Sequence, residues 1–297
     1  MTPALTSLVA AELAEPVQPR VAAMAEAIAA LYPGAARAVL FYGSCLRTAE
    51  LDGQMLDFYL IVSDYRAAYG RRWLATANSL IPPNVFPFEH HGLAAKYAVL
   101  SEADFQRETG LDARSVSVWA RFAQPARLVW AKDDEARQKV VESVAQAAPT
   151  LFEFTLPMIA DNAEPAPDDV WKRGFALTYG AELRAERKSR SSDVVEADRS
   201  RYEQFGKAAL ETVRRNTLPS HDIMTRRWRK MQRKGKWLSV LRLAKASFTF
   251  AGGIDYLAWK INRHAGTSIR IRPWHRKVPL VAAFILLPRL LKGRAIR

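Results

Sequence analysis

A Gly-Ser pair and one carboxylate within an apolar run are the residues of this sequence whose types and spacing could do chemistry. Gly43-Ser44 follows a short apolar run, and after twelve intervening residues Asp57 interrupts a second apolar run at 55–62. A glycine lets backbone N–H groups approach a phosphate, and the neighbouring serine hydroxyl can donate to the same group. A carboxylate beside them would hold Mg²⁺ against the phosphates. The pattern therefore indicates metal-assisted chemistry on a nucleoside triphosphate.

Nucleotidyltransferases of the DNA polymerase β type use these parts, usually with a second carboxylate two residues after the first. Side chains of a strand alternate between its faces, so that second carboxylate would face the same way as Asp57. Here the position holds Tyr59. Asp57 would then need help from Asp52 in the preceding turn, from Asp64 at the strand end, or from a later strand. The alternative is that Asp57 is a hydrogen-bonded structural group.

An α+β sheet domain, ending near residue 150, is expected to position these residues. Apolar residues at helical spacing from Val21 to Leu31 predict a helix that stops at Pro33-Gly34. Short apolar runs predict strands, and helical patterns lie between them. The expected strands are 38–42, 55–62, 96–100 and 126–130, and the further helices are about 65–80, one beginning at Ser101, and 134–147.

A mostly helical second domain is expected at 151–220, because the strand signal fades after Pro157 and helical stretches follow at about 168–187 and 196–216. Charge distinguishes a third region, 221–297. It holds 19 Lys and Arg against two acids, a charge of +17, whereas the first 220 residues carry −3 and the whole chain +14. Such a tail implies a polyanionic partner, either nucleic acid or an anionic membrane surface.

The tail mixes its cations with aromatic and aliphatic residues. Trp228, Trp237, Trp259 and Trp274 lie among Lys and Arg, which suits nucleic-acid stacking or a membrane interface. The apolar run at 278–291 favours the membrane, because a nucleic-acid arm has no use for exposed aliphatic surface. The run is shorter than the roughly 20 residues that span a bilayer. We expect a basic amphipathic tail on an anionic membrane surface, with nucleic acid the less favoured partner.

Cysteine usage and the N-terminus indicate the compartment. Cys45 is the single cysteine, so no internal disulfide holds the fold, as is usual in a reducing cytoplasm. The first 20 residues lack a basic segment followed by an apolar one, so no secretory signal is predicted. We expect a cytoplasmic protein bound peripherally to the inner face of the cell membrane. Glu89-His90-His91 lacks the spacing of a zinc site and predicts a loop.

Six short segments carry a further signal. They are Phe41-Tyr42-Gly43-Ser44, Met55-Leu56-Asp57-Phe58 with Val62-Ser63-Asp64, Ala95 to Ser101, Ala120 to Arg127, Thr178 to Arg184, and Ser247 to Gly253. In this order they resemble the mitochondrial-type CDP-diacylglycerol synthases, phosphatidate cytidylyltransferases of the mitochondrial translocator assembly and maintenance family. The resemblance extends from about residue 35 to 265. The family commonly has Gly-Ser-Gly and Asp-Asp where this chain has Gly43-Ser44-Cys45 and Ser63-Asp64.

The resemblance implies a fold and a reaction. The fold would be a DNA polymerase β-type nucleotidyltransferase domain at 1–150, a helical, winged-helix-like domain at 151–220 and a membrane-associating region at 221–297. The reaction would be attack of a phosphatidate phosphate on the α-phosphorus of CTP, with Mg²⁺. It would yield CDP-diacylglycerol and pyrophosphate in phospholipid biosynthesis.

The same resemblance gives the candidate site residues their expected roles. Asp57 would be the principal Mg²⁺ ligand, with Asp64 a second candidate, and Lys96 would act with Asp57 in catalysis. The expected phosphate-binding residues are Gly43, Ser44, Lys96 and Arg121 for the nucleotide and Arg184 for the lipid. Because the phosphatidate phosphate attacks, no side-chain nucleophile is required, and catalysis would consist of positioning and charge stabilisation.

Two other functions stay open. The chain could be a nucleotidyltransferase that acts on RNA, on protein or on another acidic lipid, in which case the basic tail would bind that acceptor. It could also be a catalytically degenerate nucleotide-binding scaffold, as Tyr59 at the second carboxylate position suggests.

Overall fold

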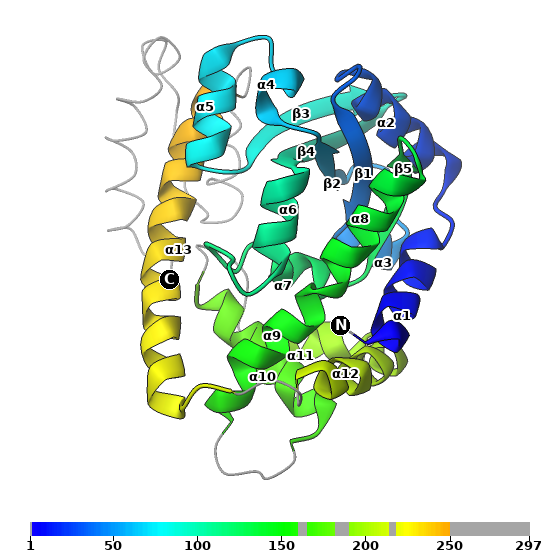
Figure 1. Cartoon of the computed structure of the whole chain (residues 1–297). Coiled ribbons are helices and arrows are strands. Elements are labelled where there is room, and N and C mark those ends of the chain that lie inside the picture. Colours follow the sequence, from blue (N-terminus) through cyan, green and yellow to red (C-terminus); the bar gives the residue numbers. More distant parts are fainter. Residues whose placement is uncertain (1, 160–164, 182–189, 214–217, 250–297) are drawn as a thin grey trace.

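The computed structural model describes residues 2–159, 165–181, 190–213 and 218–249. These residues form an α+β protein around a five-stranded mixed sheet with strand order β3-β4-β2-β1-β5 (Figure 1). Strands β2 and β4 are parallel, and the other neighbouring pairs are antiparallel. The strands are β1 (Ala36–Tyr42), β2 (Met55–Val62), β3 (Asn84–His90), β4 (Leu93–Ser101) and β5 (Ala126–Ala131).

Helices cover both faces of the sheet. The apolar side chains of β2 alternate between two hydrophobic cores, with Tyr59 and Ile61 in one and Phe58 and Leu60 in the other. The second core is closed by α2 (Pro19–Ala30), which contributes Met24 and its neighbours. The first core extends into helices on the other face. These are α1 (Pro3–Ala14), α6 (Glu102–Thr109), α7 (Trp119–Phe122), α8 (Asp134–Ala145) and α9 (Ala147–Thr155).

The four predicted strands are confirmed, and so are the helices predicted near 21–31, from Ser101, and at 134–147. The predicted helix at 65–80 is wrong in one respect, because it divides into α4 (Tyr65–Ala68) and α5 (Arg72–Leu80). Strand β3 and helix α1 were not predicted. β3 was missed because it contains Pro87, and a proline argues against a strand when only the sequence is known. Proline is tolerated here because β3 lies at an edge of the sheet.

The region after residue 150 is helical, as predicted. Residue 150 itself lies within α9, whose side chains belong to the same core as those of α1 and α8. The described residues of 151–220 contain no strand, so the likeness to a winged helix stays a prediction. The elements are η1 (Leu156–Met158), α10 (Pro167–Tyr179), α11 (Arg190–Glu196) and α12 (Arg199–Val213).

The basic region begins with a long helix, α13 (His221–Thr249), which runs along one side of the molecule (Figure 1). Its inner face buries Met224 and Trp228, and the Trp228 indole Nε1 donates to the Phe154 carbonyl at 2.8 Å. Farther along, Arg242 Nε donates to the Pro82 carbonyl at 2.8 Å. No helix among the described residues is both long and apolar enough to cross a bilayer. The apolar run at 278–291 lies outside the described residues.

Lys245 should give α13 a pH-dependent attachment. Its ammonium donates to the carbonyls of Ile81 and Pro83, and burial lowers the pKa of Lys245 to about 7. Between that pH and the ordinary lysine pKa of 10.5, the unfolded chain holds a proton that the native chain lacks. The free energy of unfolding should therefore rise with pH over this range, by up to about 1.4 kcal/mol per pH unit from this group.

The Lys245→Met variant should lose that contribution. Urea unfolding of the wild type and the variant at several pH values from neutrality to about pH 9 measures the difference in slope, in which the other titrating groups cancel. Parallel plots of unfolding free energy against pH would contradict a lowered pKa for Lys245.

Candidate functional site

Three neighbouring strands bring Gly43, Asp57 and Lys96 together. Asp57 on β2 is paired in register with Tyr42, the last residue of β1, and on its other side with Lys96 of β4. The Asp57 Oδ1 atom lies 3.0 Å from Lys96 Nζ, with 20% of the Asp57 side chain and 31% of the Lys96 side chain exposed. The pair is thus reachable by a ligand. The Asp57 carboxylate is thus an ionic partner of the Lys96 ammonium, and the expected contact of Lys96 with a phosphate stays a prediction.

Gly43 is required at its position for two reasons. Its φ of +98° is in the region that residues with a side chain rarely adopt. A Cβ atom placed on Gly43 would lie 3.1 Å from Asp57 Oδ2 and 3.4 Å from Asp57 Cβ. The glycine therefore lets the backbone lie directly against the carboxylate, and the approach of the turn to a phosphate stays a prediction.

The Gly43→Ala variant should be destabilised by about 1–3 kcal/mol, because the backbone strain and the contact with Asp57 act together. Gly70→Ala is the matched control, since a Cβ there meets nothing within 4 Å and the residue has no positive φ. Its effect should stay within about 0.5 kcal/mol. Chemical denaturation of both variants measures the difference, and equal stabilities would show that Gly43 is not constrained by Asp57.

Ser44 and Cys45 continue the turn in different ways. Ser44 is exposed at the first position of α3 (Ser44–Thr48), directly after Gly43. Cys45 is buried, and its thiol Sγ donates to the Met55 carbonyl at 3.7 Å. Burial raises the pKa of the Cys45 thiol. The third residue of the motif thus fastens α3 to the beginning of β2 and leaves Ser44 as the accessible hydroxyl of the turn.

An aromatic layer lies beside the Asp57–Lys96 pair. Asp57 shares its face of the sheet with Tyr59, as the two-residue repeat of a strand requires. Tyr59 is only 3% exposed, and its ring centroid lies 5.3 Å from that of Tyr42 and 5.3 Å from that of Phe122. The position where a second carboxylate was sought is therefore part of the core.

Asp64 lies away from Asp57. It is the N-cap of α4, and its Oδ1 accepts from the backbone N–H groups of Arg66 at 2.7 Å and Ala67 at 2.9 Å. Asp57 lies five residues before the end of β2 at Val62, which corresponds to roughly 16 Å of strand, and Asp64 lies beyond that end. The structure therefore does not bring the second candidate Mg²⁺ ligand to the site.

The two candidate arginines lie in different parts of the chain. Arg121 lies on α7, next to Phe122, which packs on the same face of the sheet as Asp57. Its guanidinium Nη1 donates to the Ser117 carbonyl. Arg184 lies outside the described residues. The site as described thus consists of Gly43, Ser44, Asp57 and Lys96, with α7 beside it.

The metal-binding capacity of the site rests on Asp57. Asp52, a candidate helper, is 82% exposed and pairs with Arg20 at 2.9 Å. Within the described part of the chain, no three His, Cys, Asp or Glu residues form a group suited to a metal ion. Mg²⁺ commonly takes one or two protein carboxylates and completes its shell with substrate phosphates and water. An accessible single carboxylate beside a cation and a glycine turn fits that mode.

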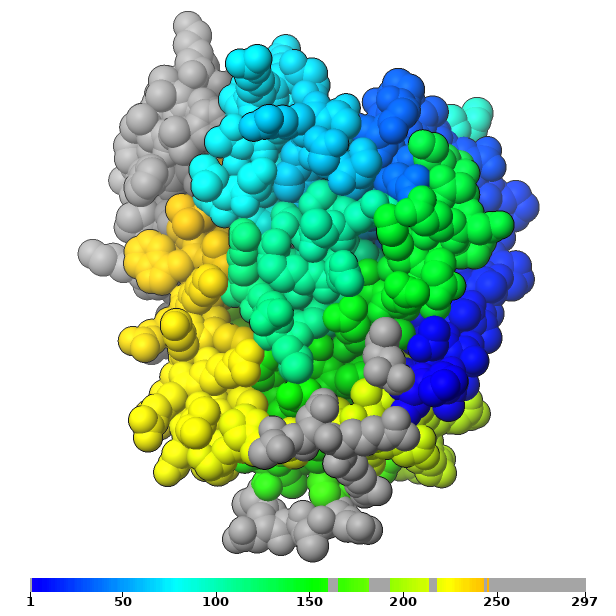
Figure 2. Space-filling model, viewed as in Figure 1, coloured from blue at the N-terminus to red at the C-terminus, as the bar shows by residue number. Residues whose placement is uncertain are grey.

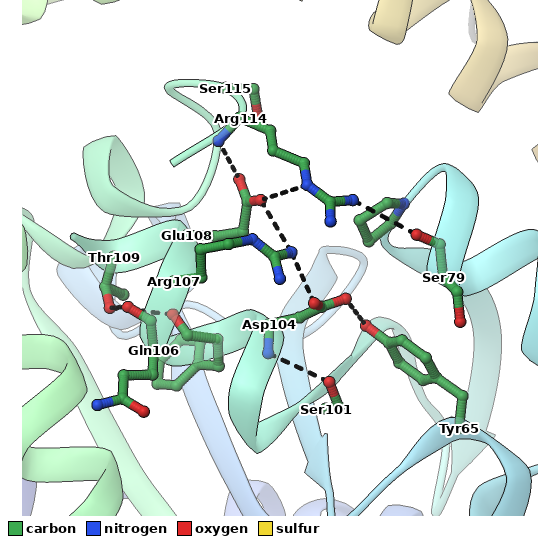
Figure 3. Close-up of polar contacts among 12 residues, drawn as sticks. Tyr65, Ser79, Ser101, Asp104, Gln106, Arg107, Glu108, Thr109, Arg114 and Ser115 are labelled. Carbon is green, nitrogen blue, oxygen red and sulfur yellow. Dashed lines mark hydrogen bonds and ion pairs between the residues drawn. The ribbon is translucent and has the colours of Figure 1, made fainter. Parts of the chain in front are cut away.

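A second cluster of charged residues, which sequence reasoning did not select, lies along α6 (Figure 3). Asp104 accepts from the Tyr65 hydroxyl at 2.5 Å and lies 2.6 Å from Arg107 Nη2. Glu108, 2% exposed, accepts from the Arg114 backbone N–H at 3.1 Å, and burial raises the pKa of its carboxyl. These carboxylates bind groups of α4, α6 and the following loop, so the cluster stabilises the fold.

Glu89-His90-His91 is only partly the predicted loop. Glu89 and His90 end β3, whereas His91 (φ 47°) and Gly92 (φ 75°) form the two-residue turn of the β3–β4 hairpin. Positive φ at both positions is typical of the tight turns that join antiparallel strands. These residues line a cavity of about 340 Å³ and belong to no group of metal ligands among the described residues.

The arrangement around Asp57 offers an oxygen ligand for a divalent cation, an ammonium group and a glycine turn with an exposed serine. These are the groups that phosphoryl and nucleotidyl transfer use to position substrates and to neutralise charge. In comparisons with known proteins, no family model matches this chain, and no curated protein is significantly similar to it.

Proposed function

We propose that this chain is a Mg²⁺-dependent cytidylyltransferase that uses CTP and phosphatidate, or a related acidic lipid, at an anionic membrane surface. The observation that supports the proposal best is the Asp57–Lys96 pair, 3.0 Å apart, with Gly43 packed against the carboxylate. The resemblance of the segments around these residues to CDP-diacylglycerol synthases supplies the nucleotide and the acceptor. The proposed compartment is the cytoplasm, with peripheral binding to the inner face of the cell membrane.

Asp57 and Lys96 exchange partners when substrate binds. Without substrate, each side chain satisfies the charge of the other. In the substrate complex, the Asp57 carboxylate would hold Mg²⁺, and the Lys96 ammonium would contact the phosphates of CTP. Bound Mg²⁺ neutralises negative charge on the triphosphate and on the departing pyrophosphate. Before substrate binds, the two opposite charges of the ion pair therefore compensate each other. Because both side chains are partly exposed, a substrate could reach and separate them.

The remaining residues position the phosphates. Ser44 donates its hydroxyl to the triphosphate, and the Gly43 turn lets the chain approach it without a side chain between them. Arg121 on α7 is the candidate for a further phosphate contact with the nucleotide, and Arg184 for one with the lipid. A phosphatidate oxygen attacks the α-phosphorus of CTP and forms the new P–O bond. The bond from that phosphorus to the bridging oxygen breaks, and pyrophosphate leaves.

Incubation of the full chain with labelled CTP, Mg²⁺ and phosphatidate liposomes tests the proposal. We expect a labelled CDP-lipid and an equal amount of pyrophosphate, both abolished when EDTA removes the metal. Liposomes that contain phosphatidylcholine alone are the control for the acceptor. If no CDP-lipid forms with Mg²⁺, phosphatidate liposomes and a saturating concentration of CTP, the proposed reaction is overturned.

The burial of Tyr59 favours a second candidate function, a nucleotide-binding scaffold without turnover. The usual second carboxylate position is a packed aromatic ring, so Asp57 is the one site carboxylate in the described residues. Isothermal titration with CTP and Mg²⁺ separates the two candidates when it is combined with assays on lipid, RNA and protein acceptors. Tight binding without transfer to any of them would support the scaffold.

A further inference from the structure

Exposed positive charge is concentrated on α13. Between residues 226 and 236 the helix carries seven cations and no acid, and all seven are exposed. Arg227 contacts the protein, because its Nη2 donates to the Leu111 carbonyl at 3.0 Å and its guanidinium lies 4.3 Å from the Phe154 ring centroid. The seven are Arg226, Arg227, Arg229, Lys230, Arg233, Lys234 and Lys236.

Exposed apolar side chains lie in line with these cations. Ile223 is 56% exposed, Trp237 69% and Leu241 42%. These three apolar residues and four of the cations follow one another along the helix mostly at intervals of three or four residues. This spacing places all seven side chains on one face of α13. We call this face the basic stripe. It consists of Ile223, Arg226, Lys230, Arg233, Lys234, Trp237 and Leu241.

The basic stripe points away from the protein. Met224, Trp228 and Met231 are 1%, 2% and 9% exposed and occupy the opposite side of α13, against the helical core. In Figures 1 and 2 the helix forms one margin of the molecule, with its yellow atoms at the surface. From Ile223 to Leu241 the stripe extends for about 27 Å along the helix axis. The inner face accounts for the packing of α13, and the composition of the outer face requires another explanation.

We propose that the basic stripe docks α13 lengthwise on an anionic phospholipid bilayer. Lys and Arg are attracted to acidic headgroups, while an exposed tryptophan and aliphatic side chains enter the boundary between headgroups and acyl chains. A nucleic acid would pair with the cations but would leave Ile223 and Leu241 without a suitable environment. Apolar residues at both ends of a cationic row therefore favour a bilayer as the partner.

Contacts of α13 with the sheet domain make this docking relevant to the site. Arg242, near the end of the stripe, donates to the Pro82 carbonyl and, through Nη1, to the Ser117 hydroxyl at 2.8 Å. The Ser117 carbonyl in turn accepts from Arg121 on α7. A bilayer bound to the stripe would therefore set the orientation of the domain that carries Asp57. The inference rests on the proposed function only for this consequence, because the stripe itself is independent of catalysis.

Vesicle cosedimentation tests the docking with the full chain. The vesicles contain phosphatidylcholine with phosphatidylglycerol, and neither CTP nor phosphatidate is present, so failure of the proposed reaction would not affect the result. We expect the fourfold variant Arg226→Gln, Lys230→Gln, Arg233→Gln, Lys234→Gln to partition about a hundredfold more weakly than the wild type. The charge-matched control replaces four exposed cations elsewhere with Gln. They are Lys132, Arg137, Arg199 and Lys207.

The control should bind within about threefold of the wild type, since its cations lie outside the stripe. Equal loss in both variants would show that net charge, and not the stripe, determines binding, and would overturn the proposal. Unchanged binding of the stripe variant would do the same. Binding of polyuridylate RNA with no binding of vesicles would assign the surface to nucleic acid and would also contradict the proposal.

Trp237 provides a second, independent readout. Vesicles with brominated acyl chains should quench part of the wild-type tryptophan fluorescence, and Trp237→Phe should remove much of that quenching. Leu31→Ala is the control, because Leu31 is 49% exposed at the end of α2, away from α13 in Figure 1. Identical quenching of the wild type and Trp237→Phe would show that Trp237 does not enter the bilayer.

Discussion

Replacement of Asp57 with asparagine should lower the formation of CDP-lipid about a thousandfold while the protein stays folded. Asparagine has the shape of aspartate, so the contact with Gly43 is preserved. Its neutral amide is a poor ligand for Mg²⁺ and leaves the Lys96 ammonium without the partner that lies 3.0 Å away in the native protein. The loss should therefore appear in kcat, since metal-assisted stabilisation of the transferring phosphate is removed.

Asp52→Asn is the matched control for Asp57→Asn. Asp52 is 82% exposed, lies in the turn before β2 and forms a solvated pair with Arg20. Its replacement should change the rate by less than about threefold, because exposed pairs of this kind contribute little. Circular dichroism and urea unfolding show whether each variant is folded. Rates for Asp57→Asn within tenfold of the wild type would exclude Asp57 as the metal ligand.

The parts of the site that lie close together in sequence were predictable from it. The run around Asp57 is apolar on both sides, so a strand covered on both faces follows, with Asp57 and Tyr59 on one face. The turn at Gly43 follows from the Gly-Ser pair. These inferences need only the two-residue repeat of a strand and the conformational range of glycine.

The contact between Asp57 and Lys96 required the structure. The two residues are 39 positions apart, and their pairing depends on β2 and β4 being parallel neighbours in a particular register. Nothing in either strand alone specifies that register, because both strands are apolar on both faces. The same limit applies to Asp64, which by its residue type suited a metal site. Its side chain accepts backbone N–H groups at the beginning of α4, a role that depends on where the strand ends.

A buried ion pair connects the helical region to the sheet domain. Arg201 of α12 contacts both carboxylate oxygens of Glu12 on α1, and its Nη1 donates to the Ala123 carbonyl at 3.1 Å, just after α7. The side chains of Arg201 and Glu12 are 8% and 9% exposed. The Arg201 guanidinium also lies 4.2 Å from the Phe205 ring centroid. Three segments distant in sequence thus share one guanidinium, next to the helix that flanks the candidate site.

The Arg201→Met variant should lose about 3–5 kcal/mol of unfolding free energy, because it leaves the Glu12 carboxylate buried without a cation. The double variant Glu12→Leu, Arg201→Met should recover most of this loss, since it removes both charges from the interior. Lys207→Met breaks the exposed pair with Glu203 on the same helix, where 66% of the lysine side chain is exposed, and should cost less than about 1 kcal/mol.

Urea unfolding of the three variants and the wild type measures these differences. Because α7 also contacts the sheet face of Asp57, Arg201→Met should weaken the site only as far as it unfolds the protein. Recovery of stability in the double variant separates this mechanism from simple loss of packing, which would make the double variant less stable than Arg201→Met. A loss for Arg201→Met no larger than for Lys207→Met would show that the buried pair does not hold the helical region to the sheet.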